Sequence, residues 1–203
     1  MGKVTRRVFL GLGVAAAGGL AVGAWYLRRP HDNPLEGELA AGETTFNPWL
    51  KVAGDGTVTV IVPRAEMGQG VTTTLAALVA EELEVPMEGL VVEAGPASPA
   101  YYNAALLQSG AAKPWETGLG AGLARTRAGT GAKLLGLQVT GGSTSTVDAF
   151  EKMRLAGATA RVQLIRAAAA RWGVAEDGLR AEAGEVVDPA GGARLGYGDL
   201  AAE

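Results

Sequence analysis

The chain has 203 residues and a formal net charge of −3; 48% of its residues are hydrophobic, 19% are charged and 5% are aromatic. This length suits one domain or a piece of a larger protein, and the weakly acidic balance argues against nucleic-acid binding through phosphate contacts. Because the chain has no cysteine, it cannot build an iron–sulfur cluster or a zinc–thiolate site by itself. The single histidine, His31, lies in a polar stretch and is interpreted as a solvated loop residue.

The first 27 residues resemble a twin-arginine export signal. Residues Thr5 to Leu10 match the pattern Ser/Thr-Arg-Arg-x-Phe-Leu, and an apolar stretch runs from Val8 to Leu27. That stretch is also long enough to span a bilayer, so a cleaved signal and a membrane anchor both stay open. In either case the remainder is expected in the periplasm. Twin-arginine export carries folded proteins, often with a cofactor already bound, so the signal favours a cofactor protein.

Residues 28–45 are rich in proline and acidic side chains without periodicity, which predicts a linker. A β-hairpin with an Asp55-Gly56 turn follows, then a helix stopped by Pro86, then a further strand. These elements are predicted over Trp49–Val52, Thr57–Val62, Val71–Glu84 and Gly89–Gly95. Their β-β-α-β order predicts an α+β fold in which helices pack on a mixed sheet.

Residues 96–140 contain many glycines and show no sustained period, which predicts a long irregular segment. A helix is predicted from about Thr146 to Trp172, opened by a capping box of Ser145 and Asp148. Two neighbouring apolar faces predict that this helix is buried between layers. One face is Phe150, Met153, Gly157, Ala160 and Leu164, and the other is Leu155, Ala158, Val162 and Ile165. A short β-meander and the first turn of another helix end the chain, which we read as a truncated domain.

Two segments place glycines and hydroxyls directly before a helix. They are EMGQG-VTTT, residues 66–74, and GGSTS-TVD, residues 141–148. A helix N-terminus presents unpaired N–H groups and positive partial charge, so each corner suits an anion or a phosphate. Gln69 adds an amide that both donates and accepts. Each corner taken singly also suits an ordinary connective turn with a capping Ser or Thr.

Other catalytic patterns are missing from the sequence. The only histidine lies in the linker, so there is no Ser/His/Asp set. The stretch GTGAKLLG lacks the Gly-Lys-Ser/Thr ending of a Walker loop. Glu81, Glu82 and Glu84 cluster at the end of a predicted helix, where they are interpreted as a solvated edge.

The stretches VTVIVPRAEMGQGVTTTLAALVAEELEVP and GGSTSTVDAFEKMRLAGATARVQLIRAAAARWGV resemble the molybdopterin-binding subunit of the xanthine dehydrogenase/aldehyde oxidase family, isoquinoline 1-oxidoreductase beta-subunit type. In that family the Met-Gly-Gln segment lies against the pterin and its phosphate, and a second segment supplies amides and hydroxyls before the later helix. The resemblance therefore implies that the cofactor-binding residues are Met67, Gly68, Gln69, Gly70, Ser143, Thr144 and Ser145.

Two features of the family qualify this assignment. Its catalytic glutamate lies in a downstream Gly-Glu segment that this chain lacks, so no catalytic residue and no metal ligand are assigned, and Glu66 is not given that role. The family also repeats related folds within one chain. It stays open whether this N-terminal copy contacts the cofactor or is a structural counterpart of the copy that does.

The leading hypothesis is that residues 46–203 are the N-terminal part of a molybdopterin-binding domain. The whole subunit would oxidise aldehydes or N-heterocycles with water-derived oxygen, while the fragment alone would be inactive. The resemblance implies molybdopterin, in a dinucleotide form, no iron–sulfur cluster in this chain, a small [2Fe-2S] subunit, and a cytochrome c as a further partner. The alternative is a non-catalytic, membrane-anchored periplasmic domain that binds another protein, or an inactive fragment.

Overall fold

A computed structural model describes residues 18, 19 and 21–201 of the chain, which divide into two compact units between residues 32 and 33. In the first unit, residues 18, 19 and 21–28 are helical, and Arg29 donates to Asp32 over 3.1 Å. The predicted twin-arginine motif lies outside the described residues, as does much of the apolar stretch behind it. Within the described ranges, no helix combines the length and the apolar character needed to cross a bilayer.

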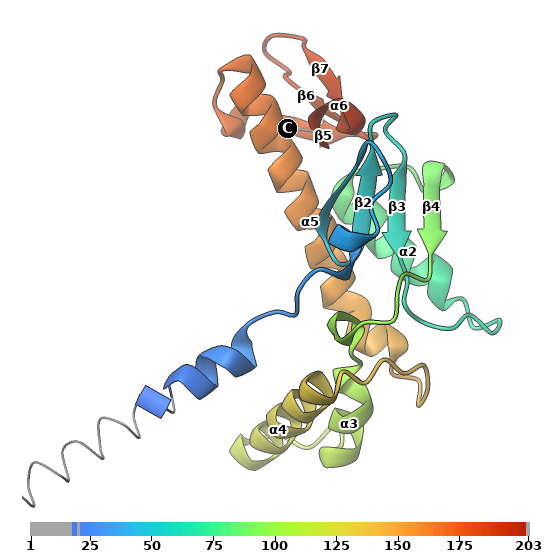
Figure 1. Cartoon of the computed structure of the whole chain (residues 1–203), viewed down its shortest axis with the longest axis vertical. Helices are drawn as coiled ribbons and strands as arrows, with labels where there is room; N and C mark the ends of the chain where they lie inside the picture. The colour runs from blue at the N-terminus through green and yellow to red at the C-terminus, as the bar shows by residue number, and fades with distance from the viewer. Residues whose placement is uncertain (1–17, 20, 202–203) are drawn as a thin grey trace, which may run out of the picture. The chain divides into compact units, whose positions relative to one another are not determined.

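The second unit is built on a four-stranded sheet in the order β1-β2-β3-β4 (Figure 1). Its strands are β1 (Glu43–Asn47), β2 (Leu50–Ala53), β3 (Val58–Ile61) and β4 (Leu90–Glu93). The first three strands are antiparallel, and β4 runs parallel to β3. The sheet is thus mixed, and the predicted hairpin and third strand are confirmed.

Strand β1 was not predicted, and it begins inside the stretch read as a linker. Its sequence, ETTFN, has little apolar alternation, so no period marks it as a strand. Pairing with β2 and tertiary bonds hold it in place: the Asn47 side-chain amide donates to the Ala156 carbonyl over 3.0 Å. A short 3₁₀ turn, η1 (Pro34–Gly37), precedes it and is capped by Asn33.

Helix α2 (Val71–Leu83) makes the crossover between β3 and β4, as the parallel pairing of these strands requires. It begins and ends close to the predicted bounds, and Glu84 closes it in the left-handed conformation, φ +57°. A 3₁₀ turn, η2 (Met87–Gly89), then leads into β4. The predicted helix is confirmed.

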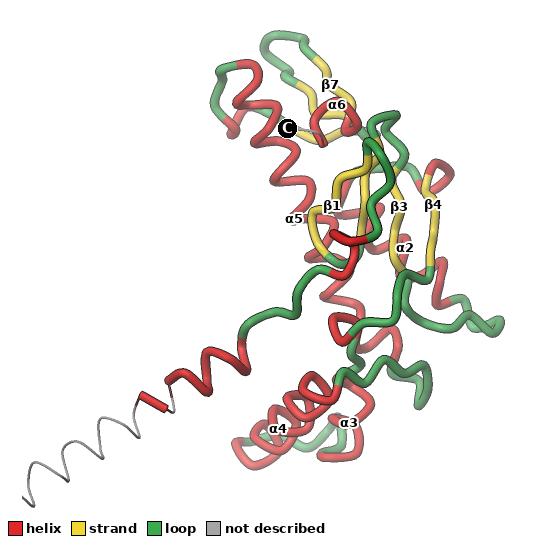
Figure 2. Tube along the Cα trace, in the orientation of Figure 1, coloured by secondary structure: helices red, strands yellow, loops and turns green. Residues whose placement is uncertain are grey.

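The prediction of an irregular segment over residues 96–140 is wrong. This segment holds a 3₁₀ turn, η3 (Pro99–Tyr101), and two helices, α3 (Ala104–Ala111) and α4 (Leu119–Leu135), which lie side by side (Figure 2). The two helices approach so closely that a Cβ added at Gly129 would lie 2.5 Å from the amide nitrogen of Gln108. Close contact through glycine and alanine leaves no apolar period in the sequence, which explains the missed helices.

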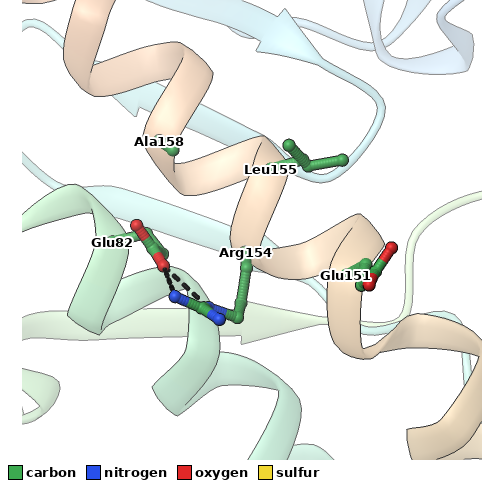
Figure 3. Close-up of a pocket in the computed structure, with 5 residues that line it drawn as sticks. All are labelled: Glu82, Glu151, Arg154, Leu155 and Ala158. Atoms are coloured by element: carbon green, nitrogen blue, oxygen red, sulfur yellow. Dashed lines mark hydrogen bonds and ion pairs between the residues drawn. The ribbon is translucent and has the colours of Figure 1, made fainter.

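Helix α5 (Ser145–Trp172) is confirmed over its full predicted length and begins one residue before the predicted start. Its first face is buried against α2 and the sheet, and the approach to α2 is closest at Gly157, where an added Cβ would lie 2.7 Å from the Val79 carbonyl oxygen. The expectation of burial on both faces is wrong: on the second face Leu155 is 64% exposed and Val162 is 41% exposed, and even on the first face Phe150, near the start of the helix, is 43% exposed. Figure 3 shows the surface beside this second face, where Arg154 donates to Glu82 of α2 over 2.7 Å.

The predicted meander and terminal helix are also confirmed. A second sheet has the order β5-β6-β7, with both pairs antiparallel, and a short helix follows it. These elements are η4 (Glu176–Gly178), β5 (Arg180–Glu182), β6 (Glu185–Val187), β7 (Arg194–Gly196) and α6 (Tyr197–Ala201).

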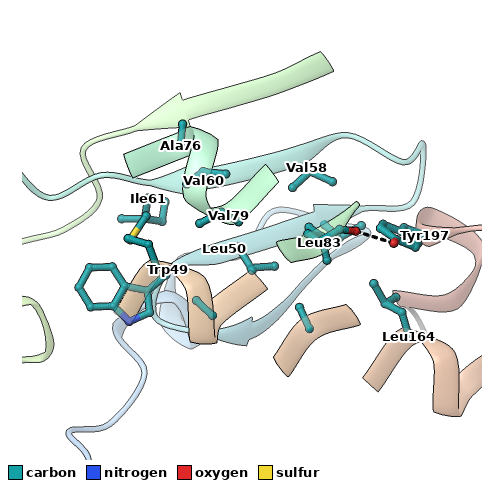
Figure 4. Close-up of a cluster of buried hydrophobic side chains, with 14 of the residues drawn as sticks. Trp49, Leu50, Val58, Val60, Ile61, Ala76, Val79, Leu83, Leu164 and Tyr197 are labelled. Atoms are coloured by element: carbon teal, nitrogen blue, oxygen red, sulfur yellow. Dashed lines mark hydrogen bonds between the residues drawn. The ribbon is translucent and has the colours of Figure 1, made fainter. Parts of the chain in front are cut away.

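The main core lies where β2 and β3 meet α2 and α5 (Figure 4). Fully buried Leu50, Val60, Val79 and Leu164 represent the four elements. The buried hydroxyl of Tyr197 joins α6 to this core by donating to the Leu83 carbonyl over 2.7 Å. Because the core holds α2 and α5 firmly, the loops that lead into these two helices end at fixed points.

Candidate functional site

The first of the two predicted segments begins in the loop between β3 and α2. From here on, the first corner means this loop, residues 63–70. The carboxylate of Glu66 accepts from the N–H groups of Gly68 at 2.8 Å, of Gly70 at 3.0 Å and of Thr72 at 3.0 Å. These bonds, led by that from Thr72, lower the pKa of Glu66 from 4.5 to about 2. The positive end of α2 is therefore neutralised by the chain's own carboxylate.

The Gln69 side chain closes the same loop. Its Oε1 accepts from the Met67 N–H over 2.6 Å, and its Nε2 donates to the Ala65 carbonyl over 2.7 Å. Gly68 and Gly70 have φ of +97° and +77°, and a Cβ at either would meet nothing within 4 Å, so backbone conformation and not crowding requires glycine. Met67 is 72% exposed. In the first corner, the amide of Gln69 braces the loop and the methionine is presented outward.

The second predicted segment reaches into α5. From here on, the second corner means its first part, residues 141–145, which leads into that helix. Ser143 is exposed and has a positive φ of +55°, which is unusual for a residue with a side chain. Thr144 is buried; its hydroxyl donates to the Gly141 carbonyl over 2.7 Å and accepts from the Asn103 amide over 2.8 Å. Ser145, also buried, is the first residue of the helix. In this part of the described chain, Thr144 gives α5 no side-chain cap.

The predicted capping box at α5 is wrong, because Asp148 turns to other partners. Its Oδ2 accepts from Arg64 Nη2 at 3.0 Å and from Lys152 Nζ at 2.7 Å. Its Oδ1 accepts from the N–H groups of Ala104 at 2.7 Å and Ala105 at 3.3 Å, so it caps α3 instead of α5. The carboxylate thus binds two cations and the N-terminus of α3, and not the N-terminus of the helix that carries it.

Arg64 and Lys152 differ in their surroundings. The Arg64 side chain is fully buried, and its Nη1 donates to the carbonyls of Pro63 at 2.8 Å and Tyr101 at 2.9 Å. Lys152 is partly exposed, lies over the Tyr102 ring and donates to the Tyr102 carbonyl over 2.8 Å. Burial lowers the pKa of Lys152, against the opposing effect of Asp148.

A direct bond also joins the two corners. The Ala65 N–H, in the first corner, donates to the Thr140 hydroxyl just before the second, over 2.8 Å. Together with the Arg64–Asp148 ion pair, this bond links segments that are far apart in the sequence. The structure thus ties the bases of the two predicted corners together.

A cavity of about 400 Å³ opens beside the second corner. It lies between that corner and the pair α3–α4, and Ser143, Thr144, Gln108 and Arg125 are among its lining residues. The Arg125 guanidinium is held by the Lys113 and Glu116 carbonyls, at 3.0 and 2.9 Å. Sequence reasoning missed Gln108 and Arg125, because it expected no ordered structure there. The basic residues of the 119–135 stretch were the only signal.

Metal binding by the protein's own side chains finds no support in residues 18, 19 and 21–201. No group of three His, Cys, Asp or Glu residues is arranged there to hold an ion.

Comparison with known proteins indicates a cofactor-binding domain. Residues 26–104 match the family model of a molybdopterin cofactor-binding domain, a range that includes the first corner and ends before the second. The chain is 33% identical over 156 residues to the isoquinoline 1-oxidoreductase subunit beta of Brevundimonas diminuta, which covers 77% of this chain and 16% of that protein. It is 27% identical over 172 residues to the membrane-bound aldehyde dehydrogenase (pyrroloquinoline-quinone) of Gluconacetobacter polyoxogenes, covering 84% and 18%.

These matches define the chain as a portion of a larger protein with a molybdopterin cofactor-binding domain. The chain spans about one sixth of the length of the two relatives. It belongs to the xanthine dehydrogenase/aldehyde oxidase family, as the sequence resemblance implied.

Proposed function

We propose that this chain is the N-terminal part of the large subunit of a molybdenum hydroxylase and contributes to its pterin cradle. The observation that carries the proposal is the tie between the two corners, because it joins the MGQG loop to the uncapped start of α5. The complete enzyme would oxidise an aldehyde or an N-heterocycle with water-derived oxygen. The similarity to an isoquinoline 1-oxidoreductase subunit and to an aldehyde dehydrogenase supports these substrate classes.

The donor groups of the two corners fit an anionic cofactor unequally. In the first corner, the amides of Gly68 and Gly70 already bind Glu66, and Gln69 is engaged within its loop. This leaves the exposed side chain of Met67 as the first corner's contact, with Gly68, Gln69 and Gly70 shaping the loop that presents it.

The second corner has more to offer a phosphate. The first N–H groups of α5 have no intrahelical partner, and Ser143 is exposed beside them. We assign phosphate contact to Ser143 and the backbone at Ser145, with Thr144 holding the turn through Gly141 and Asn103. When bound, the molybdenum cofactor supplies the two-electron chemistry. The residues of this chain would hold and orient it.

The wider setting follows from the same proposal. The pterin would carry a nucleotide, and electrons would pass to a small [2Fe-2S] subunit and a cytochrome c, because a chain without cysteine cannot hold iron–sulfur clusters. Residues 1–27 would act as a twin-arginine signal or anchor that places the protein in the periplasm. Residues 28–45 would connect this segment to the domain at 46–203, with β1 forming the domain's edge.

The alternative is a non-catalytic protein-binding domain, which an incomplete catalytic site and an irregular segment over residues 96–140 would favour. The second of these supports is lost, because the segment contains two packed helices, α3 and α4.

Metal and pterin analysis of the full-length gene product, purified with its co-expressed partner subunits from the periplasm, tests the proposal. We expect molybdenum and pterin in near-stoichiometric amounts. A variant with Arg6 and Arg7 changed to Lys is the control for the export route. It should leave the protein in the cytoplasm. A folded, exported wild-type protein with neither molybdenum nor pterin would overturn the proposal.

A further inference from the structure

The buried carboxylate of Asp148 lies where three segments meet. One is the first corner, through Arg64; the second is the start of α3; and the third is α5, which carries Asp148 and follows the second corner. We propose that Asp148, with Arg64, is a positioning residue that fixes the two corners in one arrangement so that both can hold one cofactor. This inference rests on the proposed function.

The bonding of the carboxylate is complete. It accepts four hydrogen bonds, two on each oxygen: from Arg64 and Lys152 on Oδ2, and from Ala104 and Ala105 on Oδ1. An ionised carboxylate offers about four lone-pair sites, so no acceptor capacity remains. Asp148 therefore cannot move toward one segment without losing its hold on another.

Arg64 passes this constraint to the first corner. Both terminal nitrogens of its side chain are bonded: Nη2 donates to Asp148, and Nη1 donates to the carbonyls of Pro63 and Tyr101. Arg64 directly precedes the loop that Glu66 and Gln69 hold together, so the loop is attached as a preformed piece. A planar guanidinium with several fixed donors orients its partners in a way that a lysine ammonium cannot.

The second corner is attached through Asn103. Its amide donates to the Thr144 hydroxyl at 2.8 Å and to the Val139 carbonyl at 3.0 Å, and its own carbonyl oxygen accepts from the Leu106 N–H. Asn103 immediately precedes the two N–H groups that Asp148 caps. The start of α3 is thus a common block to which both corners are bonded.

The energetics of the pair favour a positioning role over a stabilising one. The side chains of Arg64 and Asp148 are 0% and 2% exposed, and Arg64 Nε is buried without a hydrogen-bond partner among the described residues. Desolvation of a buried pair offsets much of its attraction, and an apolar replacement of both partners is often neutral for stability. The pair orients three segments whatever its net effect on the free energy of unfolding, and this is what defines a positioning role.

The test uses the full-length protein with its partner subunits. Three variants are compared with the wild type: Asp148→Asn, the double variant Arg64→Met with Asp148→Asn, and Glu82→Gln. The double variant removes both charges and keeps an oxygen to cap α3. Glu82→Gln is the matched control, because it also breaks an ion pair between α2 and α5, to Arg154, away from the corners. The measurements are amide exchange over residues 65–72 and 141–147, the urea midpoint, and molybdenum and pterin per protein.

We expect Asp148→Asn to raise amide exchange at both corners at least about tenfold and to reduce cofactor content several-fold. The double variant should regain a urea midpoint near that of the wild type and still show fast exchange and low cofactor content. Glu82→Gln should leave both corners and the cofactor unchanged.

Three results would overturn the inference. One is a double variant that regains its midpoint together with wild-type exchange and cofactor content, which would show a purely structural role. Another is faster exchange only at residues 141–147, which would show that the corners are not coupled. The last is an equal effect of Glu82→Gln on the corners. Failure of the proposed function is seen separately, as wild-type protein without molybdenum or pterin, and the exchange measurements still decide on the coupling.

Discussion

The two corners have similar sequences, with glycines and hydroxyls before a helix, yet the N-termini of their helices are capped differently. At α2 the chain supplies its own anion, because Glu66 accepts three backbone N–H groups. At α5 the nearby acid, Asp148, is drawn away to Arg64, Lys152 and α3, and no side chain from Thr144 caps the helix. A helix N-terminus is therefore an anion site only where the chain has not already filled it.

The largest expected effect on the free energy of unfolding comes from removing the carboxylate of Asp148. In Asp148→Ala, the buried Arg64 is left without its counter-ion, and the α3 N–H groups lose their acceptor. Breaking a buried ion pair from one side costs about 3–5 kcal/mol of unfolding free energy. Urea titration measures it. The surface variant Asp177→Ala is the control, with an effect within about 0.5 kcal/mol. A comparable loss in both variants would contradict the central place of Asp148.

A smaller loss is expected where the helices that carry the corners touch. A Cβ at Gly157 would lie 2.7 Å from the Val79 backbone oxygen and 3.0 Å from the Glu82 Cβ, so Gly157→Ala must push α5 away from α2. Such overpacking costs about 1–3 kcal/mol. In Gly131→Ala on α4, where a Cβ meets nothing within 4 Å, the higher helix propensity of alanine should instead stabilise by about 0.5–1 kcal/mol. Thermal unfolding of both variants checks the opposite signs.

The bonds of the Glu66 carboxylate in the first corner should make the stability of the protein depend on pH in the acid range. The folded pKa of Glu66, about 2, lies below its usual 4.5. Its contribution to stability is therefore present above pH 4.5 and is lost as the pH falls toward about 2. Glu66→Gln should be less stable than the wild type at neutral pH, and the difference should shrink across this window. Urea midpoints from neutral pH to about pH 2 measure it.

The exposed variant Glu88→Gln is the matched control for that experiment. It gives the background effect of removing a surface carboxylate, against which the Glu66→Gln difference is compared. A constant difference for Glu66→Gln would mean that the carboxylate does not bind the loop amides in solution.

Much of the fold could be predicted because its signals are local. The Asp55-Gly56 turn and the alternating strand beside it predict the hairpin, and the apolar stripes predict α2 and α5. The pair α3–α4 was missed because Gly129 and Ala132 make its contacts, and small residues leave no period. The sequence of α5 is apolar on two faces, so it could not show that only one of them is mainly buried.

The candidate site divides in the same way. Glycines and hydroxyls before a helix are visible in the sequence, so the corners themselves could be located. Their internal bonding could not, because Glu66 is one of several acids with no sequence mark as a cap, and Arg64 and Asp148 are separated by 84 positions. The capping-box pattern predicted the wrong partner: it paired Asp148 with its own helix, whereas in the structure the carboxylate binds the two cations Arg64 and Lys152.

The smallest expected change in stability belongs to Met67, and it separates the two corners most directly. This side chain is 72% exposed, so Met67→Ala should change the unfolding free energy by less than about 0.5 kcal/mol. If the first corner contributes a cofactor contact through this side chain, the full-length variant should still lose molybdenum and pterin on dialysis faster than the wild type. Met87→Ala, at an exposed site after α2, should not. Equal retention by all three proteins would make the first corner a connective turn and leave cofactor contact to Ser143 and the start of α5.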